Sequence, residues 1–270
     1  MIQSNYKVEL FKRINDDGFE QIVFCHDKSV GLKAIISIHD STLGPGVGGC
    51  RMYPYPDETA AVEDVLRLSK GMTYKASISG LKWGGGKAII IGDPNTDKTP
   101  KLLHRFGEFV NSLGGKYVTA KDVGIGGNDL KVIKEKTKFV LGIEGETGSS
   151  GDPSPLTAWG VYNGMKAAAK FTWGDPSLNK KRIAVQGLGY VSYFLLKYLS
   201  EEGASIVACD VDAKAIDRAR KKYQFDLVDP KDIDGVDCDI FSPSAMGGAI
   251  NSDSLSRLKA KVVAGAANNQ

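Results

Sequence analysis

The sequence predicts an α/β protein in which an N-terminal βα-layered domain precedes a doubly wound domain of the Rossmann type. Short apolar runs alternate with segments of helical periodicity in both halves of the chain. A loop rich in glycine, serine and proline (residues 142–155) separates the halves. In the second half, one strand leads directly into a glycine turn and a helix. We therefore expect two domains, residues 1–147 and residues 148–270.

In the first half, residues 21–25 and 32–39 are rich in Ile, Val and Phe and predict two strands. A helix is expected from Glu58, because apolar residues from there to Met72 recur at steps that place them on one face. Residues 87–91 predict a buried strand, residues 100–113 a helix, residues 116–119 a short strand and residues 129–136 another helix. The glycine-marked segments 44–51 and 80–87 are interpreted as loops, and residues 71–75 as the end of the long helix.

In the second half, residues 157–170 predict a helix, residues 182–186 a strand, residues 190–202 a helix and residues 205–210 a strand. Further strands are expected at residues 238–241 and 261–264. The alternation of strands and helices is typical of a parallel sheet with helices on its faces.

Composition argues against several classes of partner. Lys and Arg (35) nearly balance Asp and Glu (32), which does not favour nucleic-acid binding. No apolar run is long enough to span a bilayer, and residues 1–15 carry charges in every window, so we expect no membrane association and a cytoplasmic location. The four cysteines are scattered without a CxxC pair, which predicts free thiols and no metal site.

Histidine is scarce, with only His26, His39 and His104 in the chain. His26 and His39 each precede an aspartate at the end of a strand-like run, where neighbouring side chains point to opposite faces. His104 falls within a predicted helix. We interpret all three as surface or structural residues, so any acid–base chemistry is expected from Lys, Asp, Glu or Tyr.

A dinucleotide-binding turn is predicted where the strand of residues 182–186 ends. Its glycines permit a tight turn and a close approach of a pyrophosphate to the amides that open the next helix. Asp210 ends the following strand, where its carboxylate accepts hydrogen bonds from a ribose diol and repels a 2′-phosphate, so NAD is expected over NADP. Ser192 stands where Gly or Ala is usual. The cofactor-binding residues expected here are Gly187, Leu188, Gly189, Tyr190, Val191 and Asp210.

Two lysines of the first half lie in glycine-rich or apolar sequence and not on a charged face. Lys75 closes the long helix, and Lys87 follows three consecutive glycines, which indicate that the backbone there comes close to something. Lys82 is interpreted as a solvated side chain. Asp122 follows the strand of residues 116–119, at the strand end where open α/β sheets place ligand groups.

Seven segments in series resemble the Glu/Leu/Phe/Val dehydrogenases, and among them most closely the leucine, phenylalanine and tryptophan dehydrogenases. They are GPGVGGCRM, GMTYK, GLKWGGGK, VTAKDVG, GDPSPLTAWGVYNGMKAAAK, AVQGLG and AGAANNQ, in the order of that family and from about residue 44 onwards. The resemblance implies an N-terminal catalytic domain, an NAD-binding domain and the oxidative deamination of an L-amino acid to a 2-oxo acid.

The resemblance also implies residue roles. It assigns Lys87 to activating the carbonyl and the water, Lys75 to the substrate α-carboxylate and Asp122 to proton transfer. It implies that Thr157 reaches the nicotinamide carboxamide, that Ala245 lies along the cofactor, and that Asn268 and Asn269 complete the contacts to cofactor and substrate in the cleft. The side-chain pocket is formed by Val47, Gly48, Met72 and Ala120. These apolar groups suit Leu, Val, Ile, Phe or Trp and are unsuited to glutamate.

Family members continue beyond AGAANNQ, so the resemblance implies that the second domain is incomplete at its C-terminus. The uncovered apolar surface predicts a homo-oligomer. An alternative interpretation is a catalytically silent remnant that binds NAD or partner subunits without turnover. A hydroxyacid dehydrogenase is a third, but that class usually needs a histidine base, for which no suitable context exists here.

Overall fold

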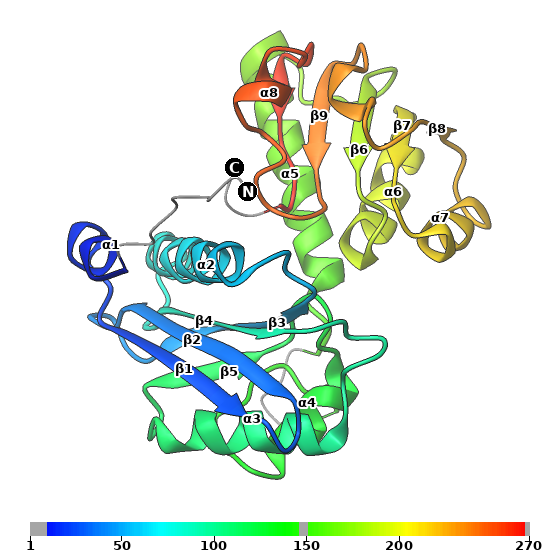
Figure 1. Ribbon diagram of the computed structural model, residues 1–270. Helices are drawn as coiled ribbons and strands as arrows, with labels where there is room; N and C mark the ends of the chain where they lie inside the picture. Colours follow the sequence, from blue (N-terminus) through cyan, green and yellow to red (C-terminus); the bar gives the residue numbers. More distant parts are fainter. Residues whose placement is uncertain (1–9, 146–150, 268–270) are drawn as a thin grey trace, which may run out of the picture. The chain divides into compact units, whose positions relative to one another are not determined.

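The computed structural model describes residues 10–145 and 151–267, which divide into two compact units, Met1–Asp152 and Pro153–Gln270 (Figure 1). The domain boundary expected at residues 147/148 lies outside the described residues. Each unit holds a five-stranded sheet, and the expected α/β fold class is confirmed.

The sheet of the first unit is mixed, with the strand order β1-β2-β4-β3-β5. Strands β1, β2 and β4 pair antiparallel, whereas β3 pairs parallel with both β4 and β5. The strands are β1 (Gln21–Asp27), β2 (Leu32–Asp40), β3 (Gly46–Tyr53), β4 (Gly84–Ile91) and β5 (Tyr117–Ala120). Since β3 lies between two parallel partners, the carboxyl ends of β3, β4 and β5 meet at one edge of the sheet.

Helices cover both faces of this sheet (Figure 1). Helices α1 (Leu10–Asp17) and α2 (Glu58–Ile78) lie on one face, and α3 (Pro100–Ser112) and α4 (Gly127–Lys134) on the other. Because strand neighbours alternate, Ile89 packs against α2 while Ala88 and Ile90 face α3. Asp57 caps α2 by accepting from the Ala60 amide, so the position of its first turn is fixed.

Two segments that were interpreted as glycine loops are strands, and that interpretation is wrong. Residues 46–53 form β3, and the glycines of residues 84–86 open β4. Glycine is depleted in strands because it has no side chain to pack, but here its absence of a Cβ permits close packing. A Cβ on Gly85 would lie 2.5 Å from the carbonyl oxygen of Ser69 on α2. The three glycines therefore approach protein backbone. The segment GMTYK, which was expected to end the long helix, lies within α2, and the helix continues to Ile78.

The second unit has a fully parallel sheet in the order β10-β9-β6-β7-β8, the order of the nucleotide-binding fold. Its elements are α5 (Ser154–Trp173), β6 (Arg182–Gln186), α6 (Tyr190–Glu201), β7 (Ser205–Cys209), α7 (Ala213–Arg220), β8 (Asp226–Leu227), η1 (Ile233–Gly235), β9 (Ile240–Pro243), α8 (Ser252–Leu255) and β10 (Val262–Val263). The strand order reverses at β6, so the carboxyl ends of β6 and β9 form the switch point.

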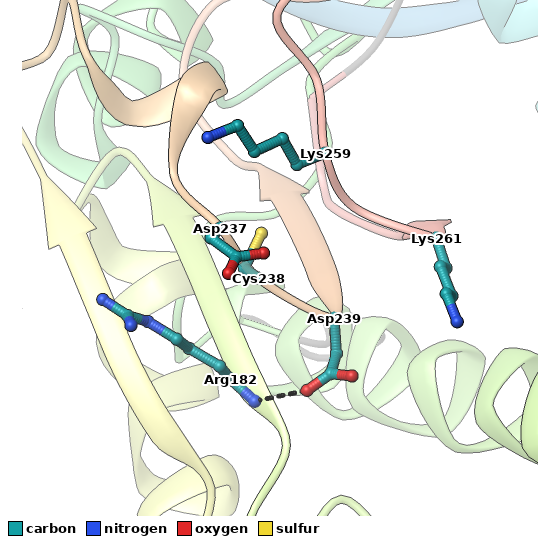
Figure 2. A pocket seen from close by; sticks show the side chains of 6 residues that line it. All are labelled: Arg182, Asp237, Cys238, Asp239, Lys259 and Lys261. Carbon is teal, nitrogen blue, oxygen red and sulfur yellow. Dashed lines mark hydrogen bonds between the residues drawn. The ribbon is translucent and has the colours of Figure 1, made fainter.

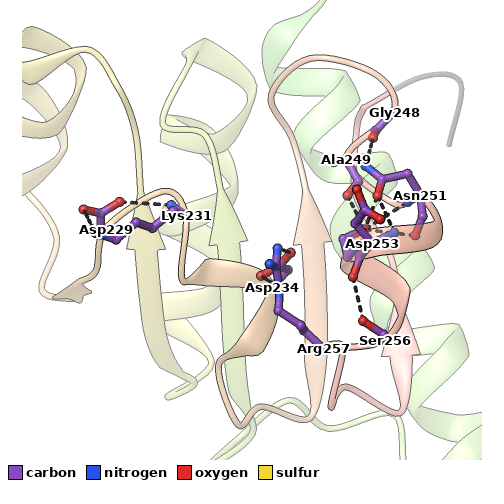
Figure 3. Close-up of polar contacts among 10 residues, drawn as sticks. Asp229, Lys231, Asp234, Gly248, Ala249, Asn251, Asp253, Ser256 and Arg257 are labelled. Carbon is purple, nitrogen blue, oxygen red and sulfur yellow. Dashed lines mark hydrogen bonds and ion pairs between the residues drawn. The ribbon is translucent and has the colours of Figure 1, made fainter.

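Polar contacts hold the chain between β9 and β10 on this sheet (Figure 3). The Arg257 guanidinium donates to Asp234 of η1 at 2.5 and 3.2 Å. The Asn251 side chain caps α8 by accepting from the Asp253 and Ser254 amides. Among the described residues, no helix has the length and apolar character needed to cross a bilayer.

Candidate active site

Lys87, in the middle of β4, and Asp122, just after β5, form a buried ion pair. Lys87 lies two residues before Ile89 on β4. Side chains two residues apart on a strand point to the same face, so Lys87 lies on the sheet face that α2 covers. Asp122 follows β5 by two residues, in a turn that bridges to Ile125. Their side chains are 3% and 15% exposed. Two residues that the sequence separates by 35 positions are thus in contact.

Arg51 extends this pair into a network of four charges. It lies on β3 with a side chain only 6% exposed, donating from Nε to Asp122 Oδ1 at 3.1 Å. Its Nη1 donates to Asp64 Oδ2 on α2 at 2.8 Å, and the Tyr55 hydroxyl donates to the same oxygen at 2.6 Å. Sequence reasoning missed Arg51, Asp64 and Tyr55. The available signal was a lone arginine between apolar residues, which is informative only once β3 is recognised as a strand.

The network determines the charge of Asp122. Burial by itself would raise the pKa of this carboxyl, but the Lys87 ammonium and the Arg51 guanidinium lower it to about 2. Asp122 is therefore an anion across the physiological pH range and serves as a hydrogen-bond acceptor. Burial raises the pKa of the neighbouring Cys50 thiol and Tyr117 phenol well above their usual values, so both stay neutral.

A glycine makes the approach of Asp122 to the strands possible. A Cβ on Gly49 of β3 would lie 2.8 Å from the Asp122 Cβ, closer than non-bonded carbon atoms approach. Glycine at this position thus lets the turn after β5 bring its carboxylate against β3 and β4.

The residues expected to form the side-chain pocket lie on β3, β5 and α2. Val47 and Gly48 belong to β3, and Ala120 ends β5, where its neighbour across the ladder is Gly49. Met72 of α2 lies beside Gly48: a Cβ on Gly48 would be 3.3 Å from the Met72 Cγ. Met72 thus lies against Gly48, and Ala120 is paired with Gly49, the glycine that faces the Asp122 side chain.

Lys75 differs from Lys87 in its environment. It lies on α2 three residues after Met72, its side chain is exposed, and it forms no ion pair with another residue that the structure describes. Lys82 is exposed too, as expected. No contact joins Lys75 to Lys87 or Asp122 within the described part of the chain, so its free ammonium is available to an external anion.

In the second unit, the glycine turn has the form that a dinucleotide requires. Gly187 adopts φ +93°, and its position leaves no room for a side chain, because a Cβ would lie 2.9 Å from the Ala245 Cβ. A Cβ on Gly189, at the start of α6, would instead meet open space. Asp210 follows β7, and its carboxylate accepts from the Leu188 amide at 2.5 Å and the Asp212 amide at 2.8 Å.

These features fit a dinucleotide. The Gly189 backbone and the amides of Tyr190 and Val191 at the first turn of α6 offer donors to a pyrophosphate beside open space. Asp210 is fixed at a strand end with lone pairs left for a diol. Ala245 is exposed and touches the turn at Gly187. Thr157 lies in the first turn of α5, donating to the Pro153 carbonyl at 2.9 Å. Asn268 and Asn269 lie outside the described residues.

Ser192 occupies a fully buried position on α6, and its hydroxyl has no hydrogen-bond partner among the described residues. An unpaired buried hydroxyl costs about 1–3 kcal/mol. Ser192→Ala should therefore raise the free energy of unfolding by about 1 kcal/mol, measured by urea denaturation. Ser200→Ala, at an exposed position of the same helix, is the control and should change it by less than about 0.5 kcal/mol. A lower stability of Ser192→Ala would show that the hydroxyl is bonded.

A cavity of about 290 Å³ lies at the opposite edge of the parallel sheet, at the amino ends of β6, β9 and β10 (Figure 2). Its lining mixes three basic and two acidic side chains, and Asp239 already accepts from the Arg182 amide at 2.9 Å. Ligands of such sheets bind at the carboxyl ends of the strands. In this unit the glycine turn, and not this cavity, lies where ligands of such sheets bind.

His39, one of the three histidines, is structural. It is buried, with Nδ1 2.8 Å from the Thr73 hydroxyl and Nε2 3.1 Å from the Asp17 carbonyl oxygen. It thereby ties α2 to α1. His26 is exposed, and His104 pairs with Glu135 on the surface. Within the described residues, no hydrogen bond or ion pair joins a histidine to Lys87 or Asp122.

Residues 19–139 match the family model of the Glu/Leu/Phe/Val dehydrogenase dimerisation domain. Leucine dehydrogenase of Bacillus subtilis (strain 168) is 52% identical over 263 residues, which cover 97% of this chain and 72% of that protein. Phenylalanine dehydrogenase of Caldalkalibacillus thermarum is 48% identical over 256 residues, 93% and 69% of the two chains. The crystal structure of L-tryptophan dehydrogenase from Nostoc punctiforme superposes with a TM-score of 0.67 at 42% identity, covering 97% and 74%.

Proposed function

The chain belongs to the Glu/Leu/Phe/Val dehydrogenase family, an amino-acid dehydrogenase group of oxidoreductases, and we propose that it deaminates an apolar L-amino acid oxidatively with NAD. The buried Lys87–Asp122 ion pair carries this proposal, because it joins a basic side chain to an ionised carboxylate with which it can exchange a proton. The reaction is L-amino acid, NAD⁺ and water to 2-oxo acid, ammonium, NADH and a proton.

Lys87 and Asp122 have complementary roles in this reaction. After a hydride leaves the substrate Cα, water must add to the resulting imine carbon and ammonia must leave. The Lys87 ammonium polarises the bond at that carbon, and in neutral form its amine accepts the proton of the attacking water. Asp122, an anion held beside Lys87, exchanges the proton with it and with the leaving nitrogen. Two groups in contact thus supply both directions of proton transfer.

Lys75 is proposed to bind the α-carboxylate of the substrate. Its exposed ammonium forms no ion pair within the described residues and lies one helical turn from Met72, whose side chain is beside Gly48. A charge-assisted hydrogen bond to a carboxylate orients the substrate so that its Cα faces the reacting groups.

The pocket residues support an apolar substrate. Val47, Met72 and Ala120 carry no charge that would compensate a side-chain carboxylate, and burying one without a partner is costly. Leu, Val, Ile, Phe and Trp all fit these groups chemically, and one methylene separates such substrates by only about 1–3 kcal/mol.

NAD is proposed as the oxidant, which accepts the hydride when bound. The residues that would hold it are Gly187, Gly189, Asp210, Ala245 and Thr157, with Asn268 as a further candidate. Asp210 favours NAD over NADP, because its carboxylate would repel a 2′-phosphate. Both carboxylate oxygens are anchored by backbone amides, so the side chain cannot easily turn away.

A homo-oligomer is proposed from the edge of the first sheet. Among the strands that the structure describes, β1 pairs with β2 alone, so it is an edge strand whose outer backbone groups can pair with another chain, and its Phe24 side chain is 58% exposed. The family model that covers this strand is described as a dimerisation domain. Light scattering should show a species larger than 29 kDa; a monodisperse monomer would reject this assembly.

The function is tested by initial rates of NADH formation with L-Leu, L-Val, L-Phe, L-Trp and L-Glu. We expect turnover with at least one apolar amino acid, a kcat/KM for L-Glu lower by at least about 10²-fold, and a marked preference for NAD over NADP. A preference for glutamate would contradict the apolar pocket. Binding of NAD without turnover of any amino acid would instead support the silent remnant.

A further inference from the structure

Arg51 joins three elements of the first unit through its two carboxylate partners. It is on β3, Asp64 is on α2, and Asp122 follows β5. Arginine suits such a bridge because its planar guanidinium presents several donors in fixed directions. Tyr55 donates to Asp64 from the segment after β3, so the far end of the bridge is held as well.

We propose that Arg51 is a positioning residue for Asp122, anchored by Asp64 and Tyr55, and that it determines which carboxylate oxygen faces Lys87. The inference rests on the proposed roles of Lys87 and Asp122 and assigns the residues that keep that pair in register.

The bonds of the two carboxylate oxygens support this role. Oδ1 of Asp122 accepts from Arg51 Nε at 3.1 Å and from the Val123 amide at 2.7 Å. Oδ2 accepts from Lys87. A rotation of the carboxylate would break the bonds to Oδ1, so Arg51 and the Val123 amide together keep Oδ2 directed at the Lys87 amine.

The charges support the role as well. Arg51 and Lys87 balance Asp64 and Asp122 in a region with little solvent. When Lys87 loses a proton, Asp122 loses one of its two cations, but Arg51 keeps its charge at any relevant pH. Asp122 therefore remains an anion and remains available to receive a proton. Cys50 and Tyr117, two buried groups whose pKa values Asp122 raises, are neutral, and the neighbouring Lys121 pairs with Asp152.

The test compares Arg51→Met and Arg51→Lys with Arg105→Met. Arg105 is a matched control, because it also bridges two carboxylates, Asp27 and Glu108, but lies on the surface helix α3. For Arg51→Met we expect kcat to fall about 10- to 100-fold with KM for the amino acid changed less than about threefold. The acid limb of the kcat/KM profile should move to higher pH by about one unit, because loss of the Arg51 cation favours proton uptake by the coupled Lys87–Asp122 pair.

Arg51→Lys should retain more activity and show a smaller pH shift, since it keeps the charge but cannot span both carboxylates. Should Arg51→Met fail to fold, Tyr55→Phe provides a milder change, which should move the acid limb in the same direction. In the Asp122→Asn background, Arg51→Met should lower kcat no further than about twofold, because its effect acts through Asp122.

An unchanged pH profile in folded Arg51→Met, Arg51→Lys and Tyr55→Phe would overturn the positioning role while leaving the proposed function intact. The positioning role would also be overturned if Arg51→Met lowered kcat by the same factor in the wild-type and Asp122→Asn backgrounds. Absence of amino-acid-dependent NADH formation in the wild-type protein would instead reject the proposed function itself. The two failures are thus distinguishable.

Discussion

Replacing Lys87 by methionine should lower kcat for amino-acid oxidation by at least about 10³-fold. Methionine has a similar length and fills the buried position, but it has neither a charge to polarise the reacting carbon nor an amine to exchange protons. The measurement is NADH formation at saturating amino acid and NAD. Because the effect lies in the reaction step, binding of NAD should change by less than about twofold.

Lys82→Met is the matched control, since this lysine is in the same glycine-rich segment but is exposed. Its kcat should remain within about twofold of wild type. Methionine at position 87 also leaves Asp122 with Arg51 as its sole cationic partner, so urea denaturation must first show that the variant is folded. Substantial turnover by a folded Lys87→Met protein would show that the lysine is not catalytic.

Replacing Asp122 by asparagine should lower kcat by about 10²- to 10⁴-fold. Asparagine keeps the shape and can still accept a bond from Arg51, but it cannot take up a proton at physiological pH. It also leaves the Lys87 ammonium buried without its carboxylate, which should lower the free energy of unfolding by about 3 kcal/mol. Asp129→Asn is the control for loss of an ion pair elsewhere in this unit, because Asp129 of α4 pairs with Lys98.

The stability of the wild-type protein should depend on Asp122 in acid. The folded-state pKa of this carboxyl lies below its ordinary value, at about 2, so its contribution is present above about pH 4 and is lost as the pH falls towards 2. The shift corresponds to about 2 kcal/mol. The difference in stability between wild type and Asp122→Asn should shrink over this range; a difference independent of pH would contradict the lowered pKa.

The periodic elements could be predicted from the sequence, because their apolar spacing reflects which face is buried. The strands predicted at residues 21–25 and 182–186 and the helix predicted from Glu58 correspond to β1, β6 and α2. Strand β3 could not be recognised in this way, since its glycines carry no side-chain pattern. They are explained by contacts between distant segments, such as Gly49 against the turn of Asp122.

Part of the candidate site could also be predicted from local sequence patterns. Lys87, Asp122, Gly187 and Asp210 could be singled out from their local context at strand ends, and the structure places the first two in contact. The partnership of Arg51 with Asp64 and Asp122 depends on how β3, α2 and β5 assemble, which no local pattern contains.

The central claim is that Lys87 and Asp122 act as one proton-transfer unit, and the double variant Lys87→Met/Asp122→Asn tests it most directly. Its kcat is measured as NADH formation at saturating apolar amino acid. It should lie within about threefold of the kcat of the slower single variant, because each single change already disables the unit. A kcat for the double variant equal to the product of the two separate losses would show that the residues act independently and would contradict the account.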